Sequence, residues 1–167
     1  IFNLYRSLST VKAITRFFSF FDNTERYPSL SAIAANVVVH TLVTDSIEHI
    51  MSRQGQIRDS ASPELAAIRR ELAEKQGAAS KLIRRIIADA QQEGWVEPDA
   101  TLAVRDGRLV IPIAASQKRR IMGIIHDESA TGKTCYVEPA PVVEINNALL
   151  ELESAERREI IRILRTL

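Results

Sequence analysis

The chain has 167 residues, 46% of them hydrophobic and 26% charged, which is close to one ordinary domain and excludes a disordered or membrane-embedded chain. Its 22 Lys and Arg residues nearly balance its 21 Asp and Glu residues, so it is not a polycation, and any basic patch must be sought by position. The single cysteine, Cys135, excludes an internal disulfide and a four-cysteine zinc site.

The N-terminal segment has no signal-like apolar run, and no apolar run in the chain approaches the length of a transmembrane helix. We therefore expect a cytoplasmic protein with no membrane partner. The chain begins at Ile1 without an initiator Met, and Leu167 falls inside a helical pattern. We expect it to be a piece of a longer protein, with the remainder of the parent chain as one of its partners.

The first part of the chain, residues 1–61, is expected to be a helical core segment. Apolar residues three or four apart predict an amphipathic helix over residues 1–21. A second helix, with Ser29 or Ser31 as its N-cap, is expected to continue to Ile50.

Two long helices follow the core segment. The first is expected over residues 62–94, with Ser62 as N-cap, Pro63 in the first helical position and Gly94 at its end. At 1.5 Å per residue, a helix of about 30 residues is roughly 45 Å long. The second, over residues 141–167, carries its own apolar face.

A small sheet is predicted between the two long helices, over residues 95–140. Residues 101–105 and 108–113 flank an Asp-Gly pair, which predicts a hairpin. Residues 120–127 and 133–138 predict two further strands. The predicted fold is therefore mainly α with a small antiparallel β insertion. A helical core is joined to a long antiparallel helix pair, a stalk that carries a roughly four-stranded sheet at its tip.

Several short motifs imitate catalytic or metal sites without completing them. Gly132-Lys133-Thr134 has Asp127 where a phosphate loop needs glycine, and it leads into a strand instead of a helix. Pro98-Asp99 lacks the second acid–lysine pair of a metal-dependent nuclease. We therefore predict no catalytic residue and no cofactor site in this chain.

The histidines, the cysteine and the paired acids also have ordinary interpretations. Asp127 and Glu128 are interpreted as a solvated turn, and Cys135 as a small apolar strand residue. His40 and His49 do not have the spacing of metal ligands, and His126 is expected to hold a turn by a hydrogen bond. No metal site is predicted.

A run of three cations stands out at the tip. The sheet region, residues 94–139, holds six basic and six acidic residues, so only its geometry could create a basic face. Such a face would contact phosphates without reading bases. The other interpretation is an edge strand whose cations prevent pairing with other chains. The candidate nucleic-acid-binding residues are Lys118, Arg119, Arg120, Lys133, Arg105 and Arg108.

Four stretches of the sequence resemble the middle of the MutS-II branch of bacterial MutS proteins. They are Gly123 to Thr134 with Glu138-Pro139 and Asn146-Asn147, the strand Arg105 to Ile113 with its Ile-Pro-Ile ending, Gly55 to Ser62, and the following Leu65, Ile68 and Arg69. The strong part of the resemblance covers about residues 55–167, whereas residues 1–50 fit the preceding helical core loosely.

The resemblance implies a helical core, a lever formed by the stalk helices and a clamp formed by the sheet. Family members are ATPases that dimerise through a later ATP-binding-cassette-type domain, and many add a C-terminal Smr nuclease domain. ATP and Mg are therefore expected in a missing domain and not in this fragment, and a homodimer is expected through the full-length protein. The branch lacks the mismatch-reading domain of repair MutS proteins.

From the residues and the resemblance together, we expect a non-catalytic lever and clamp that grips nucleic acid in response to the ATP state of the missing domain. The expected partner is branched DNA or ribosomal RNA on a stalled ribosome, and the sequence does not choose between them. The alternative is a dimerisation or protein-interaction module with no direct nucleic-acid contact.

Overall fold

The computed structural model describes residues 1–20 and 23–167 in full and, of residues 21 and 22, the backbone alone. The chain forms two compact units. Unit 1 comprises residues 1–63 and 160–167, and unit 2 comprises residues 64–159. Among the described residues, no helix combines the length and the apolar character that crossing a bilayer requires.

Unit 1 is built from short helices around a small core. The helices are α1 (Phe2–Ser19), α2 (Phe21–Arg26), α3 (Pro28–Ala35) and α4 (Thr41–Ile50), and a 3-10 turn, η1 (Asp59–Ala61), follows them. The buried cluster contains Tyr5, Ile47 and Met51, with Leu164 packed against it. The hydroxyl of Tyr5 donates a hydrogen bond to Glu48 Oε1 at 3.2 Å, which ties α1 to α4.

The single helix predicted to run to Ile50 is wrong, because the structure divides it into α3 and α4. The break covers residues 36–40, which include three consecutive valines. β-branched side chains lose rotamer freedom in a helix, and the Asn36 side chain satisfies the carbonyl of Ala32 at 2.9 Å, ending α3 there. The continuous apolar spacing concealed this break.

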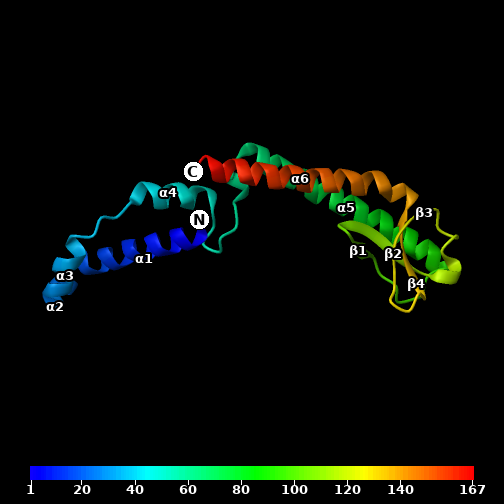
Figure 1. Ribbon diagram of the computed structural model, residues 1–167, viewed down its shortest axis with the longest axis horizontal. Helices are drawn as coiled ribbons and strands as arrows, with labels where there is room; N and C mark the ends of the chain where they lie inside the picture. The colour runs from blue at the N-terminus through cyan, green and yellow to red at the C-terminus, as the bar shows by residue number, and fades with distance from the viewer. The chain divides into compact units, whose positions relative to one another are not determined.

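The two long helices, α5 (Pro63–Gln92) and α6 (Val143–Arg165), have most of their residues in unit 2 and lie side by side as the green and orange ribbons of Figure 1. The predicted start of α5 at Pro63 is confirmed, and Gly94 adopts φ +69° just beyond its end. Leu72, Ala79 and Leu149 are buried at the seam between the helices. Arg69 Nε and Glu156 Oε1 add an ion pair of 2.7 Å across it.

The sheet is antiparallel and has the order β1-β2-β4-β3. The turn between β1 and β2 confirms the Asp-Gly hairpin, since Asp106 (φ 48°) and Gly107 (φ 76°) both have positive φ. A 3-10 turn follows β2 and another precedes α6. The elements are β1 (Ala103–Arg105), β2 (Arg108–Ala114), η2 (Ala115–Gln117), β3 (Gly123–Glu128), β4 (Thr134–Pro139) and η3 (Ala140–Val142).

One face of this sheet packs on the C-terminal half of α5, at the end of the helix pair where α5 ends and α6 begins (Figure 1). Alternate residues of β2 and β4 point to this face, as the period of two in a strand requires. The fully or almost fully buried side chains include Ile83 and Ile87 of α5 with Ile111, Ile113, Cys135 and Val137 of the sheet. The predicted fold class, a mainly helical chain with an inserted four-stranded antiparallel sheet, is confirmed.

Candidate nucleic-acid interface

The segment that carries the cationic run begins at the same end of the sheet as the turn that carries Lys133. The amide of Ala115 donates a hydrogen bond to the carbonyl oxygen of Lys133 at 2.8 Å, which joins the segment after β2 to the turn between β3 and β4. Lys118 Nζ lies 3.5 Å from Glu128 Oε1, which brings the same segment to the end of β3. We call residues 115–120 and 129–133 the basic turns.

Three of the predicted residues on the basic turns are open to solvent. Arg119, Arg120 and Lys133 are exposed, and among the described residues they have no ion-pair partner. Lys118 is half-buried and pairs with Glu128. The structure therefore brings Lys118 and Lys133 to one end of the sheet, and Arg119 and Arg120 lie on the segment that runs from there to the start of β3. Arg119, Arg120 and Lys133 keep their charge free of a neighbouring carboxylate among the described residues.

Arg105, the fifth predicted residue, lies on the outer face of the sheet. Its guanidinium carbon is 3.7 Å from the centroid of the Tyr136 ring, so the two side chains stack. Its Nε also forms an ion pair of 3.0 Å with Asp127 Oδ2. These contacts fix the guanidinium plane while leaving a third of the side chain exposed.

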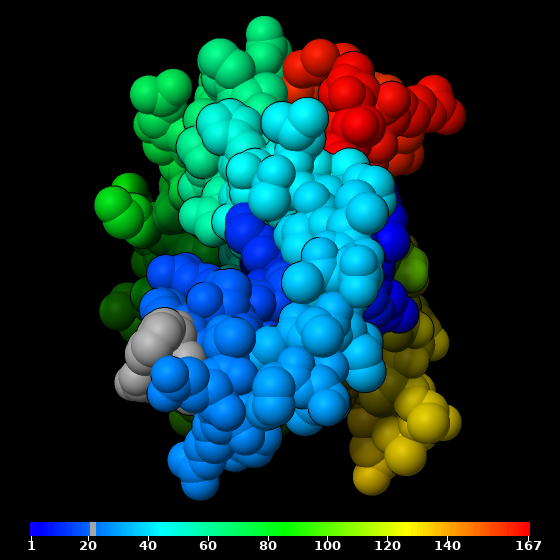
Figure 2. Space-filling model, turned by 90° about the vertical axis from the view of Figure 1, so that its left-hand side faces the viewer, coloured from blue at the N-terminus to red at the C-terminus, as the bar shows by residue number. Residues whose placement is uncertain are grey.

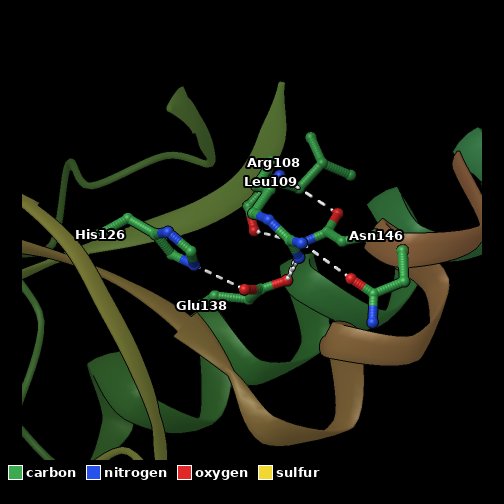
Figure 3. A network of polar contacts seen from close by, with 6 residues as sticks. Arg108, Leu109, His126, Glu138 and Asn146 are labelled. Carbon is green, nitrogen blue, oxygen red and sulfur yellow. Dashed lines mark hydrogen bonds and ion pairs between the residues drawn. The ribbon is translucent and has the colours of Figure 1, made fainter. Parts of the chain in front are cut away.

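Arg108, the sixth predicted residue, belongs to a buried polar network instead of an open surface (Figure 3). Its Nη1 lies 2.8 Å from Glu138 Oε1, and its Nη2 donates to Asn147 Oδ1 at 2.8 Å. Glu138 is 0% exposed, and its other oxygen lies 2.6 Å from His126 Nε2. A buried carboxylate needs several donors to offset its desolvation, and here it finds them on different elements.

Asn146, in the first turns of α6, completes this network. Its Nδ2 donates to Glu138 Oε1 at 2.7 Å and to the carbonyl of Leu109 at 3.0 Å, while its Oδ1 accepts from the amide of Leu109 at 3.2 Å. The network therefore ties β2, β3, β4 and α6 together at one carboxylate, as the dashed lines in Figure 3 show.

The ionisation of Glu138 is set by this network. Burial by itself raises the pKa of the carboxyl group. Hydrogen bonds from Asn146, His126 and Arg108, together with the positive charge of Arg108, outweigh burial and hold the pKa of Glu138 below its ordinary value. The carboxylate is therefore charged at neutral pH although water does not reach it.

The role of Glu138 was missed by the sequence analysis, which used it only as part of the family resemblance. Strand alternation gave no signal for its burial, because Cys135 and Val137 are the buried alternate residues and Glu138 shares the other face with Tyr136. His126 was expected to hold its own turn, but its hydrogen-bond partner, Glu138, lies on the neighbouring strand β4. The register of β3 shifts between Ile125 and Asp127, and at this bulge the His126 side chain faces Glu138 (Figure 3).

A groove of about 650 Å³ lies beside the outer face of the sheet. The strand β1 pairs with β2 only at residues 108–110, so β2 is open on that side at Pro112, which has no amide hydrogen to satisfy. Arg105 and Lys133 line the groove together with Glu97 and Asp99. Because both basic and acidic side chains line the groove, it does not form a continuous phosphate-binding surface with the basic turns.

The candidate metal-ligating residues do not form a metal site in the part of the chain that the structure describes. Among the described residues, no three His, Cys, Asp or Glu side chains gather as metal ligands would. Gly132 (φ +68°) forms part of the turn between β3 and β4. This turn leads into a strand, whereas a phosphate loop leads into a helix. Burial raises the pKa of the Cys135 thiol, and its contact with Glu128 adds to that effect, so the thiol is not activated.

No family model matches the chain. An endonuclease MutS2 of Thermomicrobium roseum is 42% identical over 143 residues, which are 86% of this chain and 18% of that protein. An endonuclease MutS2 of Pelotomaculum thermopropionicum is 36% identical over 158 residues, 95% of this chain and 20% of the relative. An endonuclease MutS2 of Alkaliphilus oremlandii is 32% identical over 164 residues, which are 98% of this chain and 21% of that protein. The chain thus spans about a fifth of the length of these curated relatives.

Proposed function

Because the chain is homologous to a fragment-sized region of the endonuclease MutS2 proteins, we propose that it is their non-catalytic lever and clamp, which grips nucleic acid through the basic turns. The lever is the α5/α6 pair and the clamp is the sheet. The target is the phosphate backbone of branched DNA or of ribosomal RNA. The ATPase and nuclease chemistry of the parent, with its ATP and Mg, would lie in parts outside this chain.

The meeting of the two basic turns at one end of the sheet is the observation that carries the proposal. Phosphates are recognised by cations that are exposed and held close together, and such contacts need no base-specific geometry. Arg119, Arg120 and Lys133 are exposed, and we infer that they meet this requirement together with Lys118. Arg105 would add a stacked guanidinium, whereas Arg108 would act from within by holding β2 in place.

The network around Glu138 supports the lever part of the proposal. It binds three strands of the sheet and the first turns of α6 through one fully buried carboxylate. A shift of α6 would therefore carry the sheet with it instead of being lost in a flexible joint. Movement produced by the ATP state of another domain would reach the basic turns by this route.

The experiment is fluorescence anisotropy of the chain against labelled duplex DNA, a four-way DNA junction and structured RNA at one low salt concentration. The test variant is the triple substitution Lys118→Glu, Arg119→Glu and Arg120→Glu. Because phosphate contacts supply most of such binding, we expect the variant to lose the affinity of the wild-type chain. Comparison of the three nucleic acids distinguishes a DNA junction from RNA as the preferred target.

A matched control separates local contacts from overall charge. Lys81, Arg84 and Arg85 are one lysine and two arginines exposed on α5, and their replacement by Glu changes the net charge by the same amount. We expect this control to bind far more tightly than the variant in the basic turn. Equal binding by the wild-type chain and the turn variant, to all three nucleic acids, would contradict the proposed grip.

A further inference from the structure

The two outer strands of the sheet differ in how their free edges are protected. β1 is three residues long, and short edge strands offer few backbone groups to another chain. β3 is six residues long and pairs only with β4, so its other edge is open among the described residues. Its first half, Gly123-Ile124-Ile125, contains neither proline nor a charged residue, which are the usual protections of such an edge.

Large apolar side chains are exposed along the same strand. Met122, immediately before β3, is 82% exposed, and Ile124 and Ile125 are 49% and 43% exposed. Successive strand residues point to opposite faces, so Met122 and Ile124 share one face and Ile125 lies on the other. An incoming strand would therefore cover apolar surface on both faces of the sheet as well as backbone groups.

The charges beside the apolar residues are polarised along the chain. Arg119 and Arg120 precede β3, whereas Asp127 and Glu128 end it. In an antiparallel pair of identical strands, the beginning of each strand meets the end of the other. Such a pair would bring the arginines of one copy toward the carboxylates of the other at both ends, as a two-fold interface requires. These carboxylates, Asp127 and Glu128, are about half exposed and also pair with Arg105 and Lys118 of their own chain.

We propose that β3 is a self-association edge, at which it pairs antiparallel with β3 of a second copy of this chain around Ile124. Pairing centred there places the two Ile124 side chains directly opposite each other and Met122 of one copy opposite His126 of the other. The two four-stranded sheets then become continuous. Nucleic-acid binding is not needed for this contact, although the contact uses Arg119 and Arg120, which the proposed function assigns to phosphates.

The contact is weak by itself, because a pair of six-residue strands covers less surface than the roughly 1,000 Å² that a stable interface needs. Association of the free chain is therefore expected to depend on protein concentration. Any parent protein that holds two copies together would strengthen it by raising the effective concentration of one edge near the other.

Cysteine cross-linking tests the register of the pairing. Residues directly opposite in an antiparallel pair have Cα atoms about 4.5–5.5 Å apart, within the range that a disulfide spans. We expect Ile124→Cys, in a Cys135→Ala background, to form a disulfide-linked dimer rapidly under mild oxidation. Val104→Cys in the same background is the matched control, because Val104 is 53% exposed on the opposite edge strand. Equal cross-linking rates for the two variants would overturn the proposal.

Lysine substitutions test the same edge without removing any cation. Ile124→Lys would place two like charges opposite each other at the two-fold axis, so we expect it to abolish the concentration-dependent increase in mass seen by light scattering. Val104→Lys should leave that increase unchanged. Because Arg119 and Arg120 stay in place, nucleic-acid binding by both variants reports on the proposed function separately. A wild-type chain that stays monomeric at every concentration would overturn the self-association edge.

Charge exchange supplies a third test. One variant carries Arg119→Glu and Arg120→Glu, and the other carries Asp127→Lys and Glu128→Lys. Each alone would bring like charges together at both ends of the strand pair, so each should lose self-association. Their mixture restores opposite charges at both ends, and we expect it to form a mixed dimer. A mixture that associates no better than either variant alone would contradict the polarised pairing.

Discussion

In unit 2, a helix and a sheet share a continuous core and a buried polar network, whereas the buried cluster described in unit 1 contains Tyr5, Ile47 and Met51. Most of the exposed large apolar side chains belong to unit 1, and Val38 and Leu42 are 73% and 82% exposed. Figure 2 shows the light-blue and cyan part of unit 1, which includes α3 and α4, open to solvent on the face in view.

The difference teaches that similar helical patterns in one chain can have very different internal support. Burial of apolar surface stabilises by about 25 cal/mol per Å², so a unit that leaves much of this surface in water gains correspondingly little. We expect unit 2 to remain folded under conditions that unfold unit 1. Trp95 packs against the unit 2 core and is the only tryptophan, so its fluorescence reports on that unit.

The largest expected effect is removal of a core side chain from unit 2. Ile83 is 0% exposed, and Ile83→Ala should lower the free energy of unfolding of unit 2 by about 2–5 kcal/mol through lost burial and the resulting cavity. Ile33→Ala in unit 1 is the matched control, since Ile33 is 66% exposed and its loss should cost less than about 0.5 kcal/mol. Urea unfolding followed by Trp95 and by circular dichroism measures both. Similar decreases in the free energy of unfolding for the two substitutions would contradict the proposed difference in support between the units.

A second prediction concerns the polar part of the unit 2 core. Glu138→Gln keeps the shape of the side chain but leaves Arg108 without its carboxylate, and we expect a loss of about 2–3 kcal/mol in the stability of unit 2. Glu71→Gln is the control, because its 3.6 Å pair with Lys75 is exposed and should contribute less than about 1 kcal/mol. Thermal unfolding at neutral pH compares the two. A neutral Glu138→Gln would show that the network does not stabilise the unit.

The same carboxylate predicts how unit 2 responds to acid. The pKa of Glu138 is lowered in the folded chain from an ordinary value of about 4.5. Its contribution to stability is therefore fully present above that pH and is lost as the pH falls through the folded-state pKa. Glu138→Gln lacks this group, so the stability difference between wild type and variant should shrink on acidification. Unfolding by urea over a series of pH values tests this, and a constant difference would contradict it.

The smallest expected effects come from two glycines that have similar open space but different backbone conformations. Gly77 lies inside α5 with no atom within 4 Å of an added Cβ, so Gly77→Ala should raise the stability of unit 2 by about 0.5–1 kcal/mol. Gly94 is equally open but has φ +69°, so Gly94→Ala should lower it by about 1–2 kcal/mol. Thermal unfolding followed by Trp95 detects both, and effects of the same sign would be unexpected.

The fold of unit 2 could be predicted from sequence because its signals are local and agree with one another. Pro63 sits at the first helical position, Asp106-Gly107 demands a tight hairpin, and Pro139 and Pro141 end the last strand before α6. In unit 1, apolar spacing continued through the valines at residues 37–39 and predicted one helix where there are two. Periodicity records which residues are apolar but not whether the backbone between them can stay helical.

The candidate site was only partly predictable for a related reason. The run Lys118-Arg119-Arg120 identified a cationic segment, but the hydrogen bond from Ala115 to Lys133 and the Lys118–Glu128 ion pair are what bring the second basic turn to the start of that segment. Arg108 has the same residue type as Arg105 and a nearby position, yet its contacts with Glu138 and Asn147 direct it into the fold. Partners far along the chain decide which cations are open, and a single sequence does not show them.

The salt dependence of nucleic-acid binding tests the central claim, that the basic turns contact phosphates, most directly. The logarithm of affinity falls linearly with the logarithm of salt concentration, and each lost phosphate contact reduces the slope by about 1. We predict that the triple Glu variant of Lys118, Arg119 and Arg120 has a slope smaller by up to about 3, while the Lys81, Arg84 and Arg85 control keeps nearly the wild-type slope. Identical slopes for the two triple variants would contradict the account.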